Sequence, residues 1–290
     1  MSRRPMPLRR RQRGVALLVV LWACTLLAVL LGGYAVMART EALQARYAFA
    51  RTQAQYAAEA GVARAIYALQ DPQTALRWIP DGRPYRFVFG DTTVQVEVID
   101  ESGKVDLNAA APEVLVGLFT AAGMQAADAR ALTDRVVAWR SFGTTVGPDP
   151  ADAAYASAGL DYGPRHGPFA SIEELRMVLG MPARIYRTVA PEVTLWSGRD
   201  APNPATAPPL ALAAIPGMDA TAIRQAQQAR MALDPATAMA SGGGVTHSIR
   251  SQATLADGTS AVVRTTIRLR GMRAGSQPYA VLRWQEGDGQ

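Results

Sequence analysis

Cysteine and histidine are almost absent from this chain of 290 residues, which contains one cysteine, Cys24, and two histidines, His166 and His247. A single cysteine excludes an intrachain disulfide. The two histidines stand in no spacing typical of a metal site or a catalytic triad. The sequence also lacks a G-x-S-x-G, P-loop or dinucleotide-binding motif. We therefore predict that the protein is not an enzyme.

Excess positive charge is confined to the first 14 residues. The formal net charge is +6 at pH 7, and residues 1–14 contain six arginines and no acid. The rest of the chain is formally neutral, which argues against charge-driven binding of nucleic acid. Arginines beside an apolar segment instead mark the side of a membrane that faces the cytoplasm.

Charge is completely absent from residues 15–38. As a helix, this segment would span about 36 Å, which is enough to cross a hydrocarbon core of about 30 Å. The segment could belong to a cleaved secretory signal, an unprocessed membrane anchor or a leader that is cut at its junction with Gly14. A signal peptide usually has a shorter apolar core of about 7 to 15 residues, although Val36-Met37-Ala38 would be a tolerable cleavage site.

Beyond the apolar segment, the residue pattern predicts a helix followed by strands. Residues 39–70 contain no proline and carry apolar side chains every three or four positions. Together with the apolar segment they predict one helix of about fifty residues that ends near Asp71-Pro72. Alternating apolar residues predict strands within four segments: 83–103, with a turn at Gly90-Asp91, and 244–255, 260–271 and 279–285.

The segment between these strands reads as short helices. They are predicted at 112–121, 126–139, 171–178, 183–188 and 209–231, with a long irregular loop at 141–168. The order of elements predicts an α+β fold, in which an all-α domain interrupts an α/β head with an antiparallel sheet. We place the first part of the head at 39–104, the inserted α-helical domain at 105–200 and the second part of the head at 201–290.

Two features of the helical part suggest binding chemistry. Asp149, Asp152 and Asp161 gather in the 141–168 loop, and calcium is bound by several oxygen ligands, often from carboxylates. Three scattered aspartates are more often a solvated loop. The Gly-Met turns near 107–124, 175–181 and 202–218 resemble helix-hairpin-helix units, some of which bind DNA phosphate. A membrane-anchored DNA-binding protein is thus the alternative function, although no arginine or lysine cluster surrounds these turns.

The junction Arg13-Gly14-Val15-Ala16 resembles the cleavage site of type IV prepilins and pseudopilins. This resemblance implies that prepilin peptidase cuts between Gly14 and Val15 and removes residues 1–14 as a leader. The family usually carries a glutamate at the fifth mature position, which pairs with the N-terminal amine of a neighbouring subunit. That position is Val19 here, so the carboxylate is missing.

Further motifs resemble the K component of type II secretion systems, the largest minor pseudopilin. They include DESGKVDLNAAAPEVL at 100–115, YGPRHGPFASIEELRMVLGM at 162–181, VTLWSG at 193–198 and NPATAPPLALAAIPGM at 203–218. The resemblance implies a pilin-like head with an inserted α-domain and a place at the pseudopilus tip, where the subunit nucleates or caps assembly for protein export. A tip subunit has no neighbour above it, which would explain Val19.

The same resemblance implies the partners and the location. The partners would be the I and J minor pseudopilins, the H component, the major pseudopilin and prepilin peptidase, with no nucleic acid. The protein would cross the inner membrane once and hold its C-terminal head in the periplasm. Some family members bind calcium through a more acidic loop, whereas this chain carries Ser141-Phe142 where relatives tend to carry acids. No cofactor is therefore required, and Ca²⁺ remains a candidate ligand only.

Overall fold

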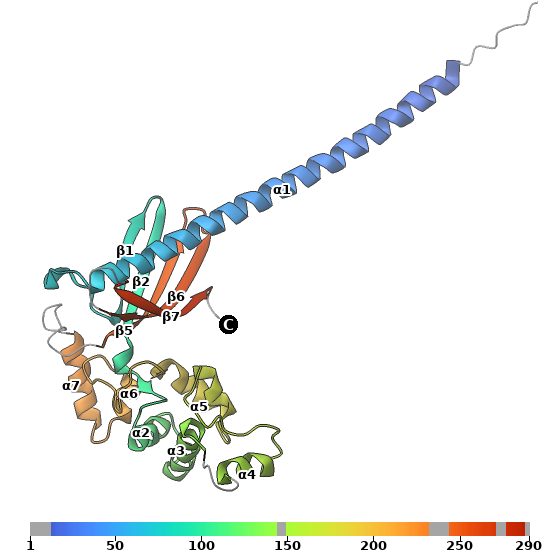
Figure 1. Cartoon of the computed structure of the whole chain (residues 1–290). Coiled ribbons are helices and arrows are strands. Elements are labelled where there is room, and N and C mark those ends of the chain that lie inside the picture. The colour runs from blue at the N-terminus through green and yellow to red at the C-terminus, as the bar shows by residue number, and fades with distance from the viewer. Residues whose placement is uncertain (1–12, 144–148, 232–243, 271–276, 288–290) are drawn as a thin grey trace, which may run out of the picture. The chain divides into compact units, whose positions relative to one another are not determined.

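The computed structural model of the chain describes residues 13–143, 149–231, 244–270 and 277–287 (Figure 1). The chain divides into two compact units, residues 1–53 and residues 54–290. One long helix, α1 (Arg13–Leu69), contributes to both units. The expected helix is confirmed, and it ends two residues before Asp71-Pro72.

The first unit contains the apolar part of α1. Its most apolar stretch of 18 residues has a mean hydropathy of 2.7, and none of that stretch is buried. The helix is therefore long and apolar enough to cross a membrane. Residues 15–38 expose aliphatic and aromatic side chains around the whole helix, which is the surface expected of a segment surrounded by lipid or by other apolar helices.

In the second unit, residues 54–69 of α1 pack on a sheet. Ala54, Ala58, Val62 and Ala65 are buried, and their spacing of three or four residues places them on one helix face. Small residues along this stripe let the helix backbone approach the strands. Gly61 is the closest point, since a Cβ atom there would collide with the hydroxyl of Ser251.

The sheet has five antiparallel strands in the order β1-β2-β5-β6-β7. Their bounds are β1 (Asp81–Phe89), β2 (Thr92–Asp100), β5 (Thr246–Thr254), β6 (Ser260–Leu269) and β7 (Tyr279–Glu286). Gly90 turns the β1–β2 hairpin with a φ of 58°, a conformation that suits glycine. Each strand falls where alternating apolar residues predicted one, so the antiparallel sheet of the expected fold class is confirmed.

Apart from the short 3₁₀ helix η1 (Thr74–Leu76) before β1, the remaining elements form a helical cluster inserted between β2 and β5 (Figure 1). They are η2 (Glu101–Gly103), β3 (Val105–Asp106), α2 (Pro112–Ala121), α3 (Ala126–Arg140), α4 (Pro150–Ser157), η3 (Ile172–Met177), α5 (Ala183–Val189), η4 (Ala190–Glu192), β4 (Val193–Thr194), α6 (Pro209–Ala214) and α7 (Ala220–Met231). β3 and β4 pair in parallel. The core of this helical domain is built around Leu115, Leu118, Phe119 and Leu132, all fully buried or nearly so.

Several sequence-based expectations for this region need correction. The expected helix 209–231 is two helices, because Pro216 and Gly217 (φ 82°) interrupt it. Asp219 then starts α7 by accepting hydrogen bonds from the amides of Thr221 (2.9 Å) and Ala222 (2.7 Å). The expected helix 171–178 is the 3₁₀ helix η3, and the loop expected at 141–168 contains α4.

The domain boundary at residue 200 stays a prediction, and the apolar core of the helical part continues beyond it. Ala207, Ala211, Leu212 and Ala214 are buried in the same cluster as α2 and α3, and α7 packs against that cluster through Ile223. These residues were assigned from the sequence to the second part of the head. The helical domain of the structure therefore extends to α7, because α6 covers apolar side chains of α2 that would otherwise be exposed.

Candidate functional site

The predicted processing site lies at the start of α1. Gly14 and Val15 are in its first turn, and Val15 is 65% exposed. Val19 follows one turn later and is 62% exposed. No charged side chain follows within 15–38, so the helix offers no carboxylate with which a neighbouring amine could pair inside an apolar bundle. Cleavage at Gly14 stays a prediction.

Two of the three candidate calcium ligands, Asp149 and Asp152, lie beside the same histidine, His166. Asp149 caps α4 by accepting a hydrogen bond from the amide of Ala151 (2.8 Å), and Oδ1 of Asp152 lies 3.0 Å from Nε2 of His166. Oδ2 of Asp149 lies 3.8 Å from Nδ1 of the same histidine. Asp161 takes no part in this pair of contacts. Within the described ranges, no three side chains of His, Cys, Asp or Glu are placed to hold a metal ion, so calcium binding stays a prediction.

Two of the three Gly-Met turns of the helical domain are contacted by an arginine from another helix. Gly123, Gly180 and Gly217 all have positive φ, as tight turns between helices require. Arg184 of α5 donates to the carbonyl of Gly123 (3.4 Å), and Arg135 of α3 donates to the carbonyl of Leu179 (3.1 Å). The turns before α3 and α5 are therefore cross-linked by each other's arginines.

This arrangement argues against DNA binding by these turns. Arg135 and Arg184 already donate to carbonyl oxygens, and residues 105–231 contain twelve acidic and ten basic side chains. A domain with a slight excess of acid lacks the electrostatic attraction on which binding to phosphates depends. The helix-hairpin-helix alternative has no further support from the geometry.

A buried polar cluster lies where the sheet meets the helical domain, and no local sequence pattern predicts it. Asp100, at the end of β2, accepts hydrogen bonds from the amides of Ser102 (2.8 Å) and Gly244 (2.7 Å). Glu101 is 1% exposed and forms an ion pair of 2.7 Å with Lys104. The carbonyl of Ser102 accepts from the amide of Asn203 (2.8 Å). These bonds link the β2 and β5 ends to the chain that precedes α6.

The junction is also closely packed. A Cβ atom at Gly103 would lie 2.5 Å from the carbonyl carbon and oxygen of Thr206. Asp106 of β3 accepts from the amides of Asn108 (2.8 Å) and Gly198 (2.7 Å), which fixes the loop after β4. The hydrogen bond between Asn203 and Ser102 and the close contact of Gly103 with Thr206 therefore hold the chain before α6 against the end of β2.

His247 lies in this cluster on β5 and is 4% exposed. Among the described residues, its Nδ1 atom has no hydrogen-bond partner. Burial lowers the pKa of His247 because it disfavours the charged imidazolium, while the nearby carboxylates of Asp100 and Glu101 act in the opposite direction. The histidine is therefore held neutral at the junction.

We expect this histidine to make folding stability depend on pH. Below its unfolded pKa of about 6.5, the unfolded chain takes up a proton that the folded chain resists, so stability falls as the pH drops toward the folded pKa. In urea unfolding, the free energy of unfolding of His247→Gln should not show this fall at low pH. The variant His166→Gln, which alters the partly exposed histidine, should still show it. Identical pH dependence in His247→Gln and the wild type would refute this explanation.

The comparisons with known proteins agree with this fold. Residues 94–198 match the family described as type II secretion system (T2SS), protein K. No curated protein is similar enough in sequence to match the chain. A chain in the crystal structure of the GspK-GspI-GspJ complex from the enterotoxigenic Escherichia coli type 2 secretion system is similar in fold, with a TM-score of 0.53 at 18% identity. The similarity covers 87% of this chain and 99% of that chain.

Proposed function

We propose that this chain, whose residues 94–198 match protein K of type II secretion systems, is the minor pseudopilin at the tip of the pseudopilus. In this role it nucleates or caps the assembly that exports proteins across the outer membrane. The observation that carries the proposal is the combination of two features in one chain. An apolar helix able to cross a membrane continues into a head whose central part matches protein K.

The proposed life cycle begins in the inner membrane. Residues 1–14 stay in the cytoplasm because of their six arginines, and the C-terminal head lies in the periplasm. Prepilin peptidase then cuts between Gly14 and Val15. The mature helix can leave the lipid only by burying its apolar surface against other helices, which is the driving force for joining a helical bundle.

The tip position is supported by Val19. A subunit inside the shaft needs a carboxylate near its start, since the amine of the subunit above would otherwise be buried without a partner. A subunit with no neighbour above has no such need. The second support is the helical domain of residues 105–231, which is linked to the end of β2 by the hydrogen bond from the amide of Asn203 to the carbonyl of Ser102 and would obstruct a further subunit.

The partners proposed for this chain follow from the same role. The similar chain of known structure comes from a complex named for GspK, GspI and GspJ. We propose that this chain likewise assembles with the I and J minor pseudopilins, joined by the H component and the major pseudopilin. Prepilin peptidase would bind it earlier, before assembly.

Co-purification tests the proposal. The full-length chain, extracted in mild detergent from cells that contain the whole secretion system, should retain the I and J components in equal amounts. A matched preparation from cells lacking prepilin peptidase should retain neither in the pseudopilus fraction. Recovery of the chain without any other pseudopilin would contradict the proposed role.

A further inference from the structure

The face of the sheet that points away from α1 is rich in arginine. Val94, Val96 and Val98 of β2 pack toward the helix, so the residues between them lie on the opposite face, here called the outer face. Extending this alternation along the strand register, with β1 taken from Pro84 onward because its register shifts before that residue, gives six charged side chains on the outer face: Arg86, Glu97, Arg250, Arg264, Arg268 and Arg283. Five are positive, although the chain beyond residue 14 has no net charge.

The register brings two of these arginines directly opposite each other. Across three neighbouring strands, Glu97 lies opposite Arg250, and Arg250 lies opposite Arg264. Like charges in directly opposed positions destabilise a sheet. Arg250 also donates from Nη2 to Oε1 of Gln252 (3.1 Å), a neighbour on the same strand.

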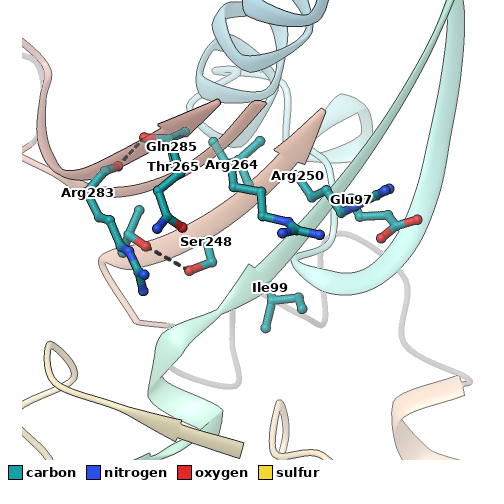
Figure 2. A pocket seen from close by; sticks show the side chains of 10 residues that line it. Glu97, Ile99, Ser248, Arg250, Arg264, Thr265, Arg283 and Gln285 are labelled. Carbon is teal, nitrogen blue, oxygen red and sulfur yellow. Dashed lines mark hydrogen bonds between the residues drawn. The ribbon is translucent and has the colours of Figure 1, made fainter. Parts of the chain in front are cut away.

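A cavity of about 250 Å³ lies over this row. Figure 2 shows Arg264 between Arg283 on one side and the neighbours Arg250 and Glu97 on the other. The floor between them is polar, since the hydroxyls of Ser248 and Thr266 are 3.0 Å apart and hydrogen-bonded. Arginine side chains can form paired, parallel hydrogen bonds with a carboxylate, so the cavity has the chemistry of an acidic-group receptor.

One carboxylate of the chain already binds at the edge of the outer face. Oε1 of Glu173, which follows Ile172 in η3, lies 3.4 Å from Nη2 of Arg283. Both side chains are partly exposed, at 55% for Glu173 and 35% for Arg283. The contact shows how a glutamate from outside the sheet reaches this face.

We propose that the outer face is a docking surface for an extended acidic segment of a protein partner. Neighbouring strands are about 5 Å apart, and side chains on one edge of an extended peptide recur about every 7 Å. Successive acidic side chains of such a segment can therefore reach Arg250, Arg264 and Arg283 in turn. The inference does not depend on the tip position, because it rests on the sheet alone.

The composition of the face favours a protein over a polyphosphate. Glu97 stands within the arginine row and would repel the closely spaced phosphates of DNA or of a lipid surface. Ile99, which is 37% exposed, lines the same cavity and offers an apolar contact. A protein segment can match acidic, polar and apolar positions together, as interfaces between proteins do.

Peptide binding to the detergent-solubilised full-length chain tests this proposal. The probe is a fluorescent peptide of alternating glutamate and threonine, and its control has glutamine in place of glutamate. We expect the acidic peptide to bind more tightly and to dissociate as salt rises. The double variant Arg250→Gln/Arg264→Gln should bind it about tenfold more weakly, since two charge-assisted contacts are lost.

The matched control removes two arginines elsewhere. Arg187→Gln/Arg224→Gln changes exposed residues of α5 and α7 and should bind the acidic peptide as the wild type does. The double variant could fail to fold, so the single variant Arg264→Gln is measured as well. We expect it to fold and to bind the peptide about threefold more weakly. Equal binding by both double variants, or no binding at low salt, would overturn the proposal. The proposal would also be overturned if duplex DNA or anionic vesicles bound more tightly than the acidic peptide and this binding depended on Arg250 and Arg264.

Discussion

Gly14→Leu should leave the chain uncut when it is produced together with prepilin peptidase. Gly14 is the last residue before 24 positions without charge, so the scissile peptide would lie at the membrane surface. A peptidase that works there needs an unhindered peptide, and glycine is the residue without a side chain. Leucine would place four carbon atoms beside the bond to be broken. Mass spectrometry of the purified chain would show residues 1–14 retained.

Two controls separate this effect from a general disturbance of the helix. Gly33→Leu alters a glycine within the apolar segment, where an added Cβ atom meets nothing within 4 Å, and it should be processed normally. Gly14→Ala adds one carbon and should be cut more slowly than the wild type but not be blocked. Complete cleavage of Gly14→Leu after residue 14 would show that the leader has been assigned wrongly.

Gly117→Val should destabilise the helical domain more than any other single substitution considered above. Gly117 lies in α2 where that helix crosses α6, and an added Cβ atom would be 2.9 Å from the carbonyl carbon of Ala214 and 3.0 Å from its Cα. Backbone atoms cannot rotate away as a side chain can, so the two helices must separate. Overpacking in a core costs about 1–3 kcal/mol and occasionally more.

The measurement is thermal unfolding of the full-length chain in detergent, followed by near-ultraviolet circular dichroism. A loss of about 3 kcal/mol lowers the melting temperature of a domain of 150–250 residues by roughly 6–12 °C. Gly167→Ala is the matched control in the same domain, because its Cβ atom would come no closer than 4.0 Å to another atom. Equal melting temperatures of Gly117→Val and the wild type would mean that α2 and α6 are not in close contact.

The elements that could be predicted from the sequence are those whose pattern is local. The β1–β2 hairpin follows from alternating valines and Gly90-Asp91, and α1 follows from an uninterrupted run without proline. The end of the helical domain could not be located in this way. Leu212 and Ile223 carry the same apolar pattern whether they pack on the sheet or on α2, and only the three-dimensional contacts assign them to α2 and its neighbours.

The functional features also differ in whether they can be predicted from the sequence. The junction at Gly14 is a contiguous motif and is visible in the sequence, whereas the buried cluster of Asp100, Glu101 and His247 joins residues almost 150 positions apart. The outer face is harder still to foresee. Its arginines come from separate strands, and their proximity depends on the register that sets Arg250 opposite Arg264.

The number of copies in one assembled pseudopilus tests the central claim most directly. Pseudopili sheared from cells that carry an epitope after Glu286 would be labelled with antibody and viewed by electron microscopy. The account predicts label at one end of each fibre and none along the shaft. Label repeated at regular intervals along the shaft would contradict it, since the helical domain and the missing carboxylate at Val19 would then be compatible with subunits stacked above.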